Sequence, residues 1–296
     1  MSRQLAADER IVRVEELVGG ATAEMRRLSI EAPDGSSRDL VLRTFVDPFF
    51  VKHADDWLKR EAGALELLTG TGVPAPALVA VDPGAAHCAY PSLLMTHLAG
   101  RSVFGDESVE DRIPLLARQL VAIHALRPAS RPRDYEAWTT ADTVVTPAGA
   151  DTAAWAAAID MIRKPPPPYE GCYLHRDFHP GNVLFDASRI TGVIDWAQPS
   201  WGPADLDVAH CSTNLAVLHG PAWGPRFSDA YEEAGGVLAA DARERLYWRV
   251  RDALALSEEL HLVARGWREA GRTDLTEPAV EARLDAYVTA LMDVRG

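Results

Sequence analysis

The segment YLHRDFHPGNVLF, residues 173–185, constrains this chain more than any other feature. It brings His175, Asp177 and Asn182 close together, and a second apolar run, GVIDW, ends in Asp195. An Asp can orient a hydroxyl and accept its proton, while Asn and Asp offer oxygen ligands to a hard cation. One base followed by two such ligands is the order that phosphoryl transfer from a nucleotide requires. The segment therefore predicts a kinase.

The residues between these polar groups predict a bend followed by a hairpin. Pro180-Gly181 lets the chain turn so that Asp177 and Asn182 face one cavity. The apolar runs Val183–Phe185 and Ile190–Ile194 then predict two short paired strands. We therefore expect the polar side chains to lie at strand ends.

Neither a zinc site nor a disulfide framework is predicted. His175 and His179 are four residues apart, as zinc ligands on a helix would be, but the Pro-Gly pair that follows opposes a helix. Cys88, Cys172 and Cys211 are widely spaced and unpaired in the sequence, which is typical of reduced thiols in a cytosolic protein.

Length and composition predict a globular protein of one large domain or two lobes. The chain has 296 residues, of which 47% are hydrophobic and 25% charged. Its first ten residues are polar and charged, and no apolar run approaches the roughly 18 residues that a membrane span needs. We therefore expect a cytoplasmic protein without a membrane partner.

The net charge of −13 disfavours nucleic acid as a partner, because phosphate backbones are held by clustered Lys and Arg. It favours, weakly, a cationic small molecule. An acidic surface that only keeps the protein in solution explains the same charge.

The predicted elements change in character along the chain, from strands to helices. Strands are predicted at Arg10–Val18, Glu24–Glu31, Asp39–Phe45, Ala77–Val81 and Ser92–Thr96, with one helix at Asp55–Leu68. Helices are predicted at Ile113–Leu126, after Asp151 as N-cap, and at 203–218, 241–270 and 277–293. The pattern predicts an α+β fold with a small antiparallel-sheet lobe at 1–97 and a larger, mostly helical lobe at 98–296.

HRDFHPGNVLF followed by GVIDW resembles the signature of the aminoglycoside phosphotransferase and choline kinase-like family, relatives of protein kinases. The resemblance implies a protein kinase-like fold of two lobes. It implies Asp177 as catalytic base, Asn182 and Asp195 as magnesium ligands, and His175 as a supporting member of the catalytic loop. In GPADLDVAH it implies that Asp207 accepts backbone N–H groups of that loop.

Asp205, in the same segment, is a weaker candidate for that supporting role. We interpret it instead as the N-cap of a helix that begins DLDVAH.

The nucleotide-binding residues are less sharply marked. Gly19, Gly20 and Thr22 lie between two predicted strands, where glycine lets backbone N–H groups approach phosphate, although a plain hairpin turn explains them equally well. The family's strand Lys is replaced by Arg43, which can bind phosphate and carboxylate through two nitrogens, and Glu61 matches its helix partner. Lys52 is a rival cation, and an exposed strand Arg is the other interpretation of Arg43.

The segment 93–100, LLMTHLAG, resembles the hinge that binds an adenine edge through backbone atoms. It would bring Met95, His97 and Leu98 to the nucleotide. A buried strand followed by a glycine turn explains the same residues.

These features predict transfer of the γ-phosphate of ATP, or of GTP, with Mg²⁺, to a hydroxyl of a small acceptor. The family resemblance makes an aminoglycoside or another antibiotic the first expectation, helped weakly by the acidic pairs Glu232-Glu233 and Glu258-Glu259. A metabolite kinase acting on choline, a sugar or an amino alcohol is the alternative, and a non-catalytic kinase-fold binding protein is a second one. The oligomeric state is not predicted.

Overall fold

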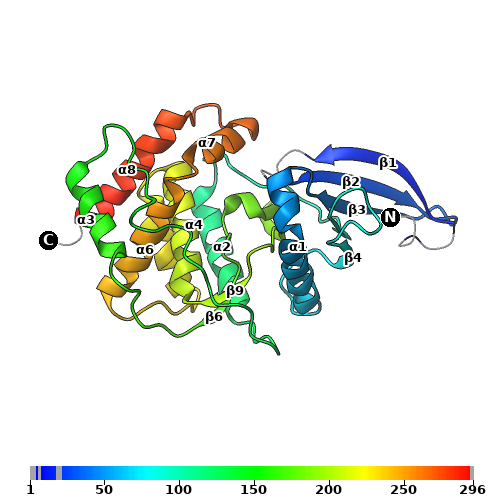
Figure 1. The fold of residues 1–296 in the computed structure, drawn as a ribbon, viewed down its shortest axis with the longest axis horizontal. Helices are drawn as coiled ribbons and strands as arrows, with labels where there is room; N and C mark the ends of the chain where they lie inside the picture. The colour runs from blue at the N-terminus through cyan, green and yellow to red at the C-terminus, as the bar shows by residue number, and fades with distance from the viewer. Residues whose placement is uncertain (1–4, 6–7, 18–21, 294–296) are drawn as a thin grey trace. The chain divides into compact units, whose positions relative to one another are not determined.

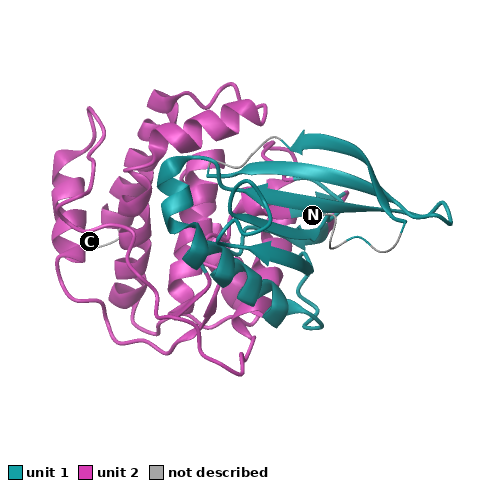
Figure 2. Cartoon of the chain, turned by 45° about the vertical axis from the view of Figure 1, so that its right-hand side comes forward, with its two compact units in different colours: residues 1–101, 184–186, 190–198 teal, residues 102–183, 187–189, 199–296 magenta. Residues whose placement is uncertain are grey.

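The computed structural model describes residues 5, 8–17 and 22–293 (Figure 1). The chain divides into two compact units, coloured separately in Figure 2. Unit 1 comprises residues 1–101, 184–186 and 190–198, and unit 2 comprises residues 102–183, 187–189 and 199–296. Unit 1 thus takes in part of the predicted hairpin as well as the N-terminal segment.

Unit 1 is built on an antiparallel sheet whose strands lie in the order β1-β2-β3-β5-β4. The strands are β1 (Arg10–Leu17), β2 (Glu24–Glu31), β3 (Ser37–Thr44), β4 (Leu78–Asp82) and β5 (Ser92–Thr96). Alternating apolar residues explain the sheet, because Leu28, Ile30, Leu40, Leu42 and Leu94 form one buried cluster. The predicted antiparallel lobe is confirmed.

Helix α1 (Pro48–Leu68) begins earlier than the sequence pattern predicted. We expected it to begin at Asp55, because the apolar residues with helical spacing are Leu58, Leu65 and Leu68. The structure instead uses Asp47 as N-cap, whose carboxylate accepts the Phe49 N–H at 2.8 Å, and Pro48 fits the first helical position. The buried face of α1 includes Glu61, a charged residue among alanines and leucines.

Unit 2 is mostly helical and has its own hydrophobic core. Its helices are α2 (Val109–His124), α3 (Thr152–Ile162), α4 (Ala204–His219), α5 (Trp223–Glu233), α6 (Ala242–Leu256), α7 (Leu260–Glu269) and α8 (Glu277–Asp293). Helix α4 packs against α2, α5, α6 and α8, and all but the ends of it are buried. Because α4 is buried on every side, any polar group on it must find a partner within unit 2.

Two details of the helical pattern differ from expectation. The single helix predicted at 241–270 is two helices, α6 and α7, separated at Ser257, whose hydroxyl donates to the Leu254 carbonyl at 2.7 Å. Helix α5 was not predicted, because Gly224 and Pro225 near its start resemble a loop.

The predicted hairpin is formed by β7 (Val183–Asp186) and β8 (Arg189–Val193). It follows a 3₁₀ turn at Pro180–Asn182 and the short strand β6 (Cys172–Leu174), which pairs with β9 (Ser200–Gly202). The loop that carries the polar motif therefore lies between β6 and this turn.

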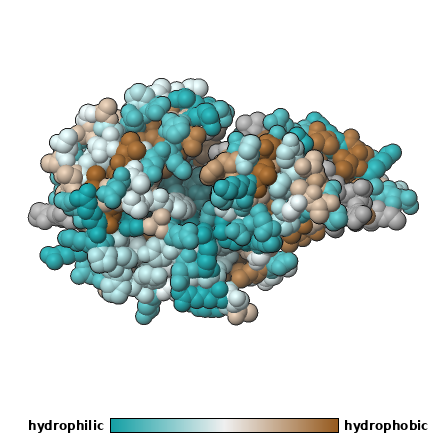
Figure 3. Space-filling model, in the orientation of Figure 1, coloured by the Kyte–Doolittle hydropathy of each residue, from teal (hydrophilic) through white to brown (hydrophobic). Residues whose placement is uncertain are grey.

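No helix among the described residues is long and apolar enough to cross a membrane. Some apolar side chains nevertheless reach the surface of unit 1, where brown atoms gather over the sheet in Figure 3. Ile11, Val12 and Val14 of the edge strand β1 are 36%, 51% and 57% exposed.

Candidate active site

The catalytic loop of unit 2 is fixed by one buried carboxylate. Asp207, in the first turn of α4, accepts the backbone N–H groups of His175 and Arg176, both at 2.8 Å. Arg176 has a φ of 74°, a left-handed conformation that non-glycine residues adopt only when their surroundings hold them. Asp207 therefore holds a strained turn immediately before Asp177.

Asp207 is itself enclosed by polar partners. It is fully buried, and its Oδ2 lies 3.2 Å from Nε2 of His124, whose Nδ1 lies 2.7 Å from the Tyr231 hydroxyl. Burial works to raise the pKa of Asp207, but the hydrogen bond and charge of His124, together with the charges of Arg176 and His175, outweigh burial and leave the pKa below its usual value. The carboxylate thus stays ionised as an acceptor for the loop.

Asp177 receives one hydrogen bond on each carboxylate oxygen. Asn182 donates its side-chain N–H to Oδ2 at 2.9 Å, and Nε2 of His210 lies 3.1 Å from Oδ1. Burial works to raise the pKa of Asp177, but the neighbouring imidazole rings of His179 and His210, together with the hydrogen bond from His210, hold it well below its usual range. The side chain remains 35% exposed, so this ionised carboxylate is accessible to a reacting group.

His210 of α4 lies between two carboxylates. Its Nε2 faces Asp177, and its Nδ1 lies 3.1 Å from Oδ1 of the buried Asp252 on α6. Burial alone would lower the pKa of His210, but the charge of Asp252 and the hydrogen bonds to both carboxylates raise it to about 10. The ring is therefore an imidazolium at neutral pH and donates from both nitrogens.

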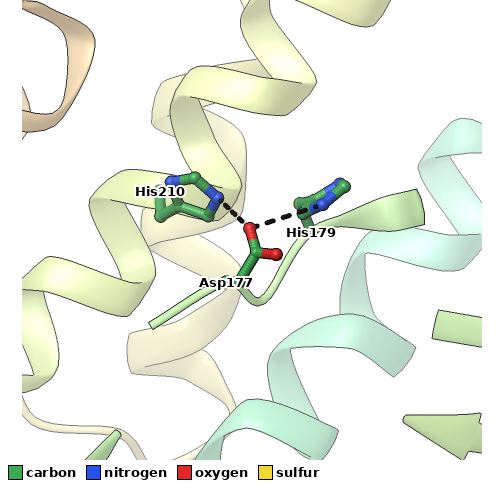
Figure 4. Close-up of side chains that lie close together, drawn as sticks. All are labelled: Asp177, His179 and His210. Carbon is green, nitrogen blue, oxygen red and sulfur yellow. Dashed lines mark hydrogen bonds and ion pairs between the residues drawn. The ribbon is translucent and has the colours of Figure 1, made fainter. Parts of the chain in front are cut away.

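The ligand atoms of Asp177, His179 and His210 lie within 4.8 Å of one another. Figure 4 shows both rings beside the Asp177 carboxylate. Their protons, however, do not suit a transition metal. His179 accepts the Gly181 N–H on Nδ1 at 3.1 Å, which leaves its ring proton on Nε2, the atom that faces Asp177 at 3.6 Å. His210 donates to Asp177 at 3.1 Å, so both rings present an N–H, and not a lone pair, to the carboxylate.

Unit 1 holds a second charged centre, built around Arg43. Its Nη1 donates to both oxygens of Glu61, at 3.1 and 3.0 Å, and to Oδ1 of Asp195 at 2.9 Å. Its Nη2 donates to the Thr22 hydroxyl at 3.3 Å. Burial would lower the pKa of Arg43, but Asp195 and Glu61 raise it. Arg43 is 5% exposed, so the interpretation of an exposed strand Arg is wrong.

Asn182 in unit 2 and Asp195 in unit 1 each carry an oxygen of the kind that a hard cation binds. Asn182 directs its amide nitrogen to the carbonyl and carboxylate of Asp177, each at 2.9 Å, which turns its amide oxygen away from them. Asp195, just beyond β8, has a φ of 62° and gives only Oδ1 to Arg43. An amide oxygen and a carboxylate oxygen are ligands that Mg²⁺ accepts.

The other predicted nucleotide residues lie in unit 1 or outside the described residues. Met95 is buried in β5, while Leu98 approaches Gly192, where any Cβ would lie 2.6 Å from Leu98 Cδ1. His97 donates its backbone N–H to the Asp39 carbonyl at 3.1 Å, so this N–H is used within the sheet. Gly19 and Gly20 lie outside the described residues.

Two further interpretations need correction. Asp205 is not the N-cap of α4, because the cap position is Pro203, and Asp205 instead accepts the Ala239 N–H at 3.1 Å. The rival cation Lys52 lies on an exposed face of α1.

Sequence reasoning missed His210 and Asp252. His210 follows Asp207 by three residues, so helical periodicity alone places the two on one face of α4. Asp252 carries no comparable signal. Sequence reasoning also missed Trp138. Its ring packs edge-on against His210, with ring centroids 5.2 Å apart.

Solved structures of small-molecule kinases share this fold. Aminoglycoside phosphotransferase APH(4)-Ia, solved as a thermostable mutant with ADP and hygromycin B, is 18% identical, with a TM-score of 0.60 and 94% of each chain covered. Amicoumacin kinase hAmiN, solved with AMP-PNP, Ca²⁺ and Ami, is 13% identical, with a TM-score of 0.59, 94% of this chain and 88% of that chain covered. The macrolide 2′-phosphotransferase type I is 17% identical, with a TM-score of 0.59, 93% of this chain and 92% of that chain covered.

The model of the phosphotransferase enzyme family matches residues 13–249, and the chain belongs to this family. An aminoglycoside 3′-phosphotransferase of Streptomyces ribosidificus is 29% identical over 108 residues. That match spans 36% of this chain and 40% of the relative's own length.

Proposed function

We propose that this protein transfers the γ-phosphate of ATP, or of GTP, to a hydroxyl group of a small molecule. The observation that carries the proposal is the state of Asp177, an ionised, partly exposed carboxylate with one donor on each oxygen. Such a group can accept a hydroxyl's hydrogen bond and orient its oxygen. Membership of the phosphotransferase family supports the reaction class.

Asp177 has one task in the proposed reaction. The acceptor hydroxyl donates its hydrogen bond to the carboxylate, which directs the oxygen lone pair toward the γ-phosphorus. The bond from acceptor oxygen to phosphorus forms as the bond from phosphorus to the β–γ bridging oxygen breaks, and the nucleoside diphosphate leaves with that electron pair. The hydroxyl proton passes late to Asp177. His175 supports the loop, since its Nδ1 accepts the Asp177 N–H at 3.2 Å.

The nucleotide is assigned to unit 1. We propose that Arg43, paired with Glu61, binds the α and β phosphates in place of the family's Lys. Asn182 and Asp195 are each proposed as a ligand of Mg²⁺, which when bound would neutralise phosphate charge. Further proposed nucleotide contacts are Gly19, Gly20, Thr22, Met95, His97 and Leu98.

The acceptor is proposed to be an aminoglycoside or another antibiotic, by similarity to the proteins named above. The acidic pairs add little support, because Glu232 is paired with Arg245 at 3.0 Å and Glu258 accepts hydrogen bonds from Thr139 and Thr143. A surface pocket of about 400 Å³ in unit 2 has a mixed lining of Thr140, Ala141, Asp142, Ile162, Arg163 and Arg251. The acceptors tested should therefore include neutral as well as cationic molecules.

The test incubates purified protein with Mg²⁺, ATP or GTP, and a panel of aminoglycosides, macrolides, choline, sugars and amino alcohols. Mass spectrometry and ³¹P NMR would detect the phosphorylated product and locate the phosphate. We expect one class of acceptor to be phosphorylated. A protein that binds nucleotide but phosphorylates no acceptor would favour the non-catalytic alternative.

A further inference from the structure

We propose that His210, anchored by Asp252, is a positioning residue that sets the orientation of the Asp177 carboxylate for phosphoryl transfer. The inference rests on the proposed function and deepens it. It assigns a role to two residues that lie far from the catalytic motif in the sequence.

The first argument is geometric. Asn182 donates to Oδ2 and His210 donates to Oδ1 of Asp177, at 2.9 and 3.1 Å. Two donors on different elements, the 3₁₀ turn and α4, determine the rotation of the carboxylate about its Cβ–Cγ bond. Without His210, the only hydrogen bond left to the carboxylate among the described residues would be the one at Oδ2, because His179 Nε2 lies 3.6 Å from Oδ1, beyond hydrogen-bond distance. The oxygen that meets the hydroxyl would then no longer be fixed.

The second argument is the way in which the His210 ring is held. Asp252 binds Nδ1 from behind while Nε2 faces Asp177, so a rotation of the ring would break both contacts. The rings of Trp138 and His179 pack edge-on against it at centroid distances of 5.2 and 5.7 Å. The ring is therefore confined on its hydrogen-bonding edges and by aromatic neighbours.

The third argument is charge. Asp252 is 5% exposed, and its Oδ2 makes no hydrogen bond within the described part of the chain. A buried carboxylate needs a nearby cation, and His210 is in direct contact with it. The polar and charged groups that face His210 are Asp177 and His179 of the catalytic loop, Asp252 of α6 and Asn214 of α4, with Arg176 close to both carboxylates.

The test compares His210→Ala and His210→Gln with the matched control His219→Gln. His219 also lies on α4 and also contacts an aspartate, Asp106, at 2.6 Å, but it lies at the far end of the helix. We expect kcat to fall up to about 100-fold for His210→Ala, less for His210→Gln and less than twofold for the control, with KM for the nucleotide nearly unchanged. Added imidazole should restore part of kcat in His210→Ala only.

A double-mutant cycle tests the anchor. If Asp252 acts through His210, Asp252→Asn should lower kcat in the wild-type background and have little further effect in His210→Gln. Additive effects would overturn the role of Asp252. A kcat of His210→Gln within twofold of wild type would overturn the proposal, and this variant also serves if His210→Ala does not fold.

Ring ¹⁵N spectra separate this inference from the proposed function. At about pH 8, above the ordinary pKa of histidine, His210 should carry protons on both ring nitrogens. If no acceptor is phosphorylated, the proposed function fails, and the spectra alone test the arrangement of His210. Two protonated nitrogens support the His210 arrangement, whereas a single protonated nitrogen overturns it.

Discussion

The two units each place one cation between two carboxylates, but they use different cations. In unit 1, Arg43 lies between Glu61 and Asp195, and in unit 2, His210 lies between Asp177 and Asp252. Arg keeps its charge at every pH that a protein tolerates, while the charge of His depends on its neighbours. Unit 1 thus has a permanent charged centre, and unit 2 has one whose charge is maintained by its surroundings.

We expect turnover to depend on the unit 2 centre. We expect Asp177→Ala to lower kcat by about 10²- to 10⁴-fold, because the acceptor hydroxyl loses its base and its orienting partner. Nucleotide affinity, measured by titration calorimetry, should stay within threefold of wild type. Asp186→Ala, at an exposed turn of the β7–β8 hairpin, is the control and should keep full activity. An unchanged rate in Asp177→Ala would remove this residue from the mechanism.

The unit 1 centre should be the more important one for folding. Arg43→Met leaves Glu61 buried without its cation, so we expect a loss of about 3 to 5 kcal/mol in the free energy of unfolding, measured in urea. Arg38→Met on the same strand is the control, because the Arg38 side chain is 43% exposed and its pair with Glu9 should be worth less than about 1 kcal/mol. Equal losses in the two variants would contradict the assignment. Arg43→Lys should fold and bind nucleotide more weakly.

The pH dependence of stability distinguishes the two cations. The folded pKa of His210, about 10, lies above its unfolded value of 6.5, so its stabilisation is complete below about pH 6.5 and is lost as pH rises through about 10. Between pH 6 and pH 9, wild type should lose about 1 to 3 kcal/mol more stability than His210→Gln. The free energy of unfolding would be measured in urea at each pH. If it changed with pH equally in the two proteins, His210 would not carry this charge.

Of the substitutions considered, one at an exposed ion pair should have the smallest effect on stability and activity. Glu232 and Arg245 form a salt bridge at 3.0 Å, with side chains 43% and 30% exposed. Glu232→Gln should change the free energy of unfolding by less than about 0.5 kcal/mol and leave KM for the acceptor unchanged. A raised KM for a cationic acceptor would instead return this acidic pair to the acceptor site.

The elements that could be predicted from the sequence are those determined by interactions between residues close together in the chain. The five strands of the unit 1 sheet and the β7–β8 hairpin depend on alternation and turns over a few residues, and these were predicted correctly. Helix α5 and the break after α6 were not, because tertiary packing overrides local propensity there.

The site divides in the same way. The residues of the motif lie within one loop and could be found by spacing. The contact between Arg43 and Asp195 joins residues 152 positions apart, and those of His210 with Asp177 and Asp252 join residues 33 and 42 apart. No local pattern reports such pairs, since they arise only when segments distant in the sequence pack together.

The contact between Arg43 and Asp195 also has a consequence for the order of ligand binding. If Asp195 binds Mg²⁺ as proposed, a free ion must compete with the Arg43 guanidinium, a permanent cation, which already occupies Oδ1 of this carboxylate. A triphosphate changes this competition, because it offers the guanidinium new oxygens and brings its own ion. We expect Mg²⁺ to enter the site already bound to the nucleotide. Free Mg²⁺ should therefore bind the protein only weakly, and the Mg²⁺–nucleotide complex should bind before any free ion does.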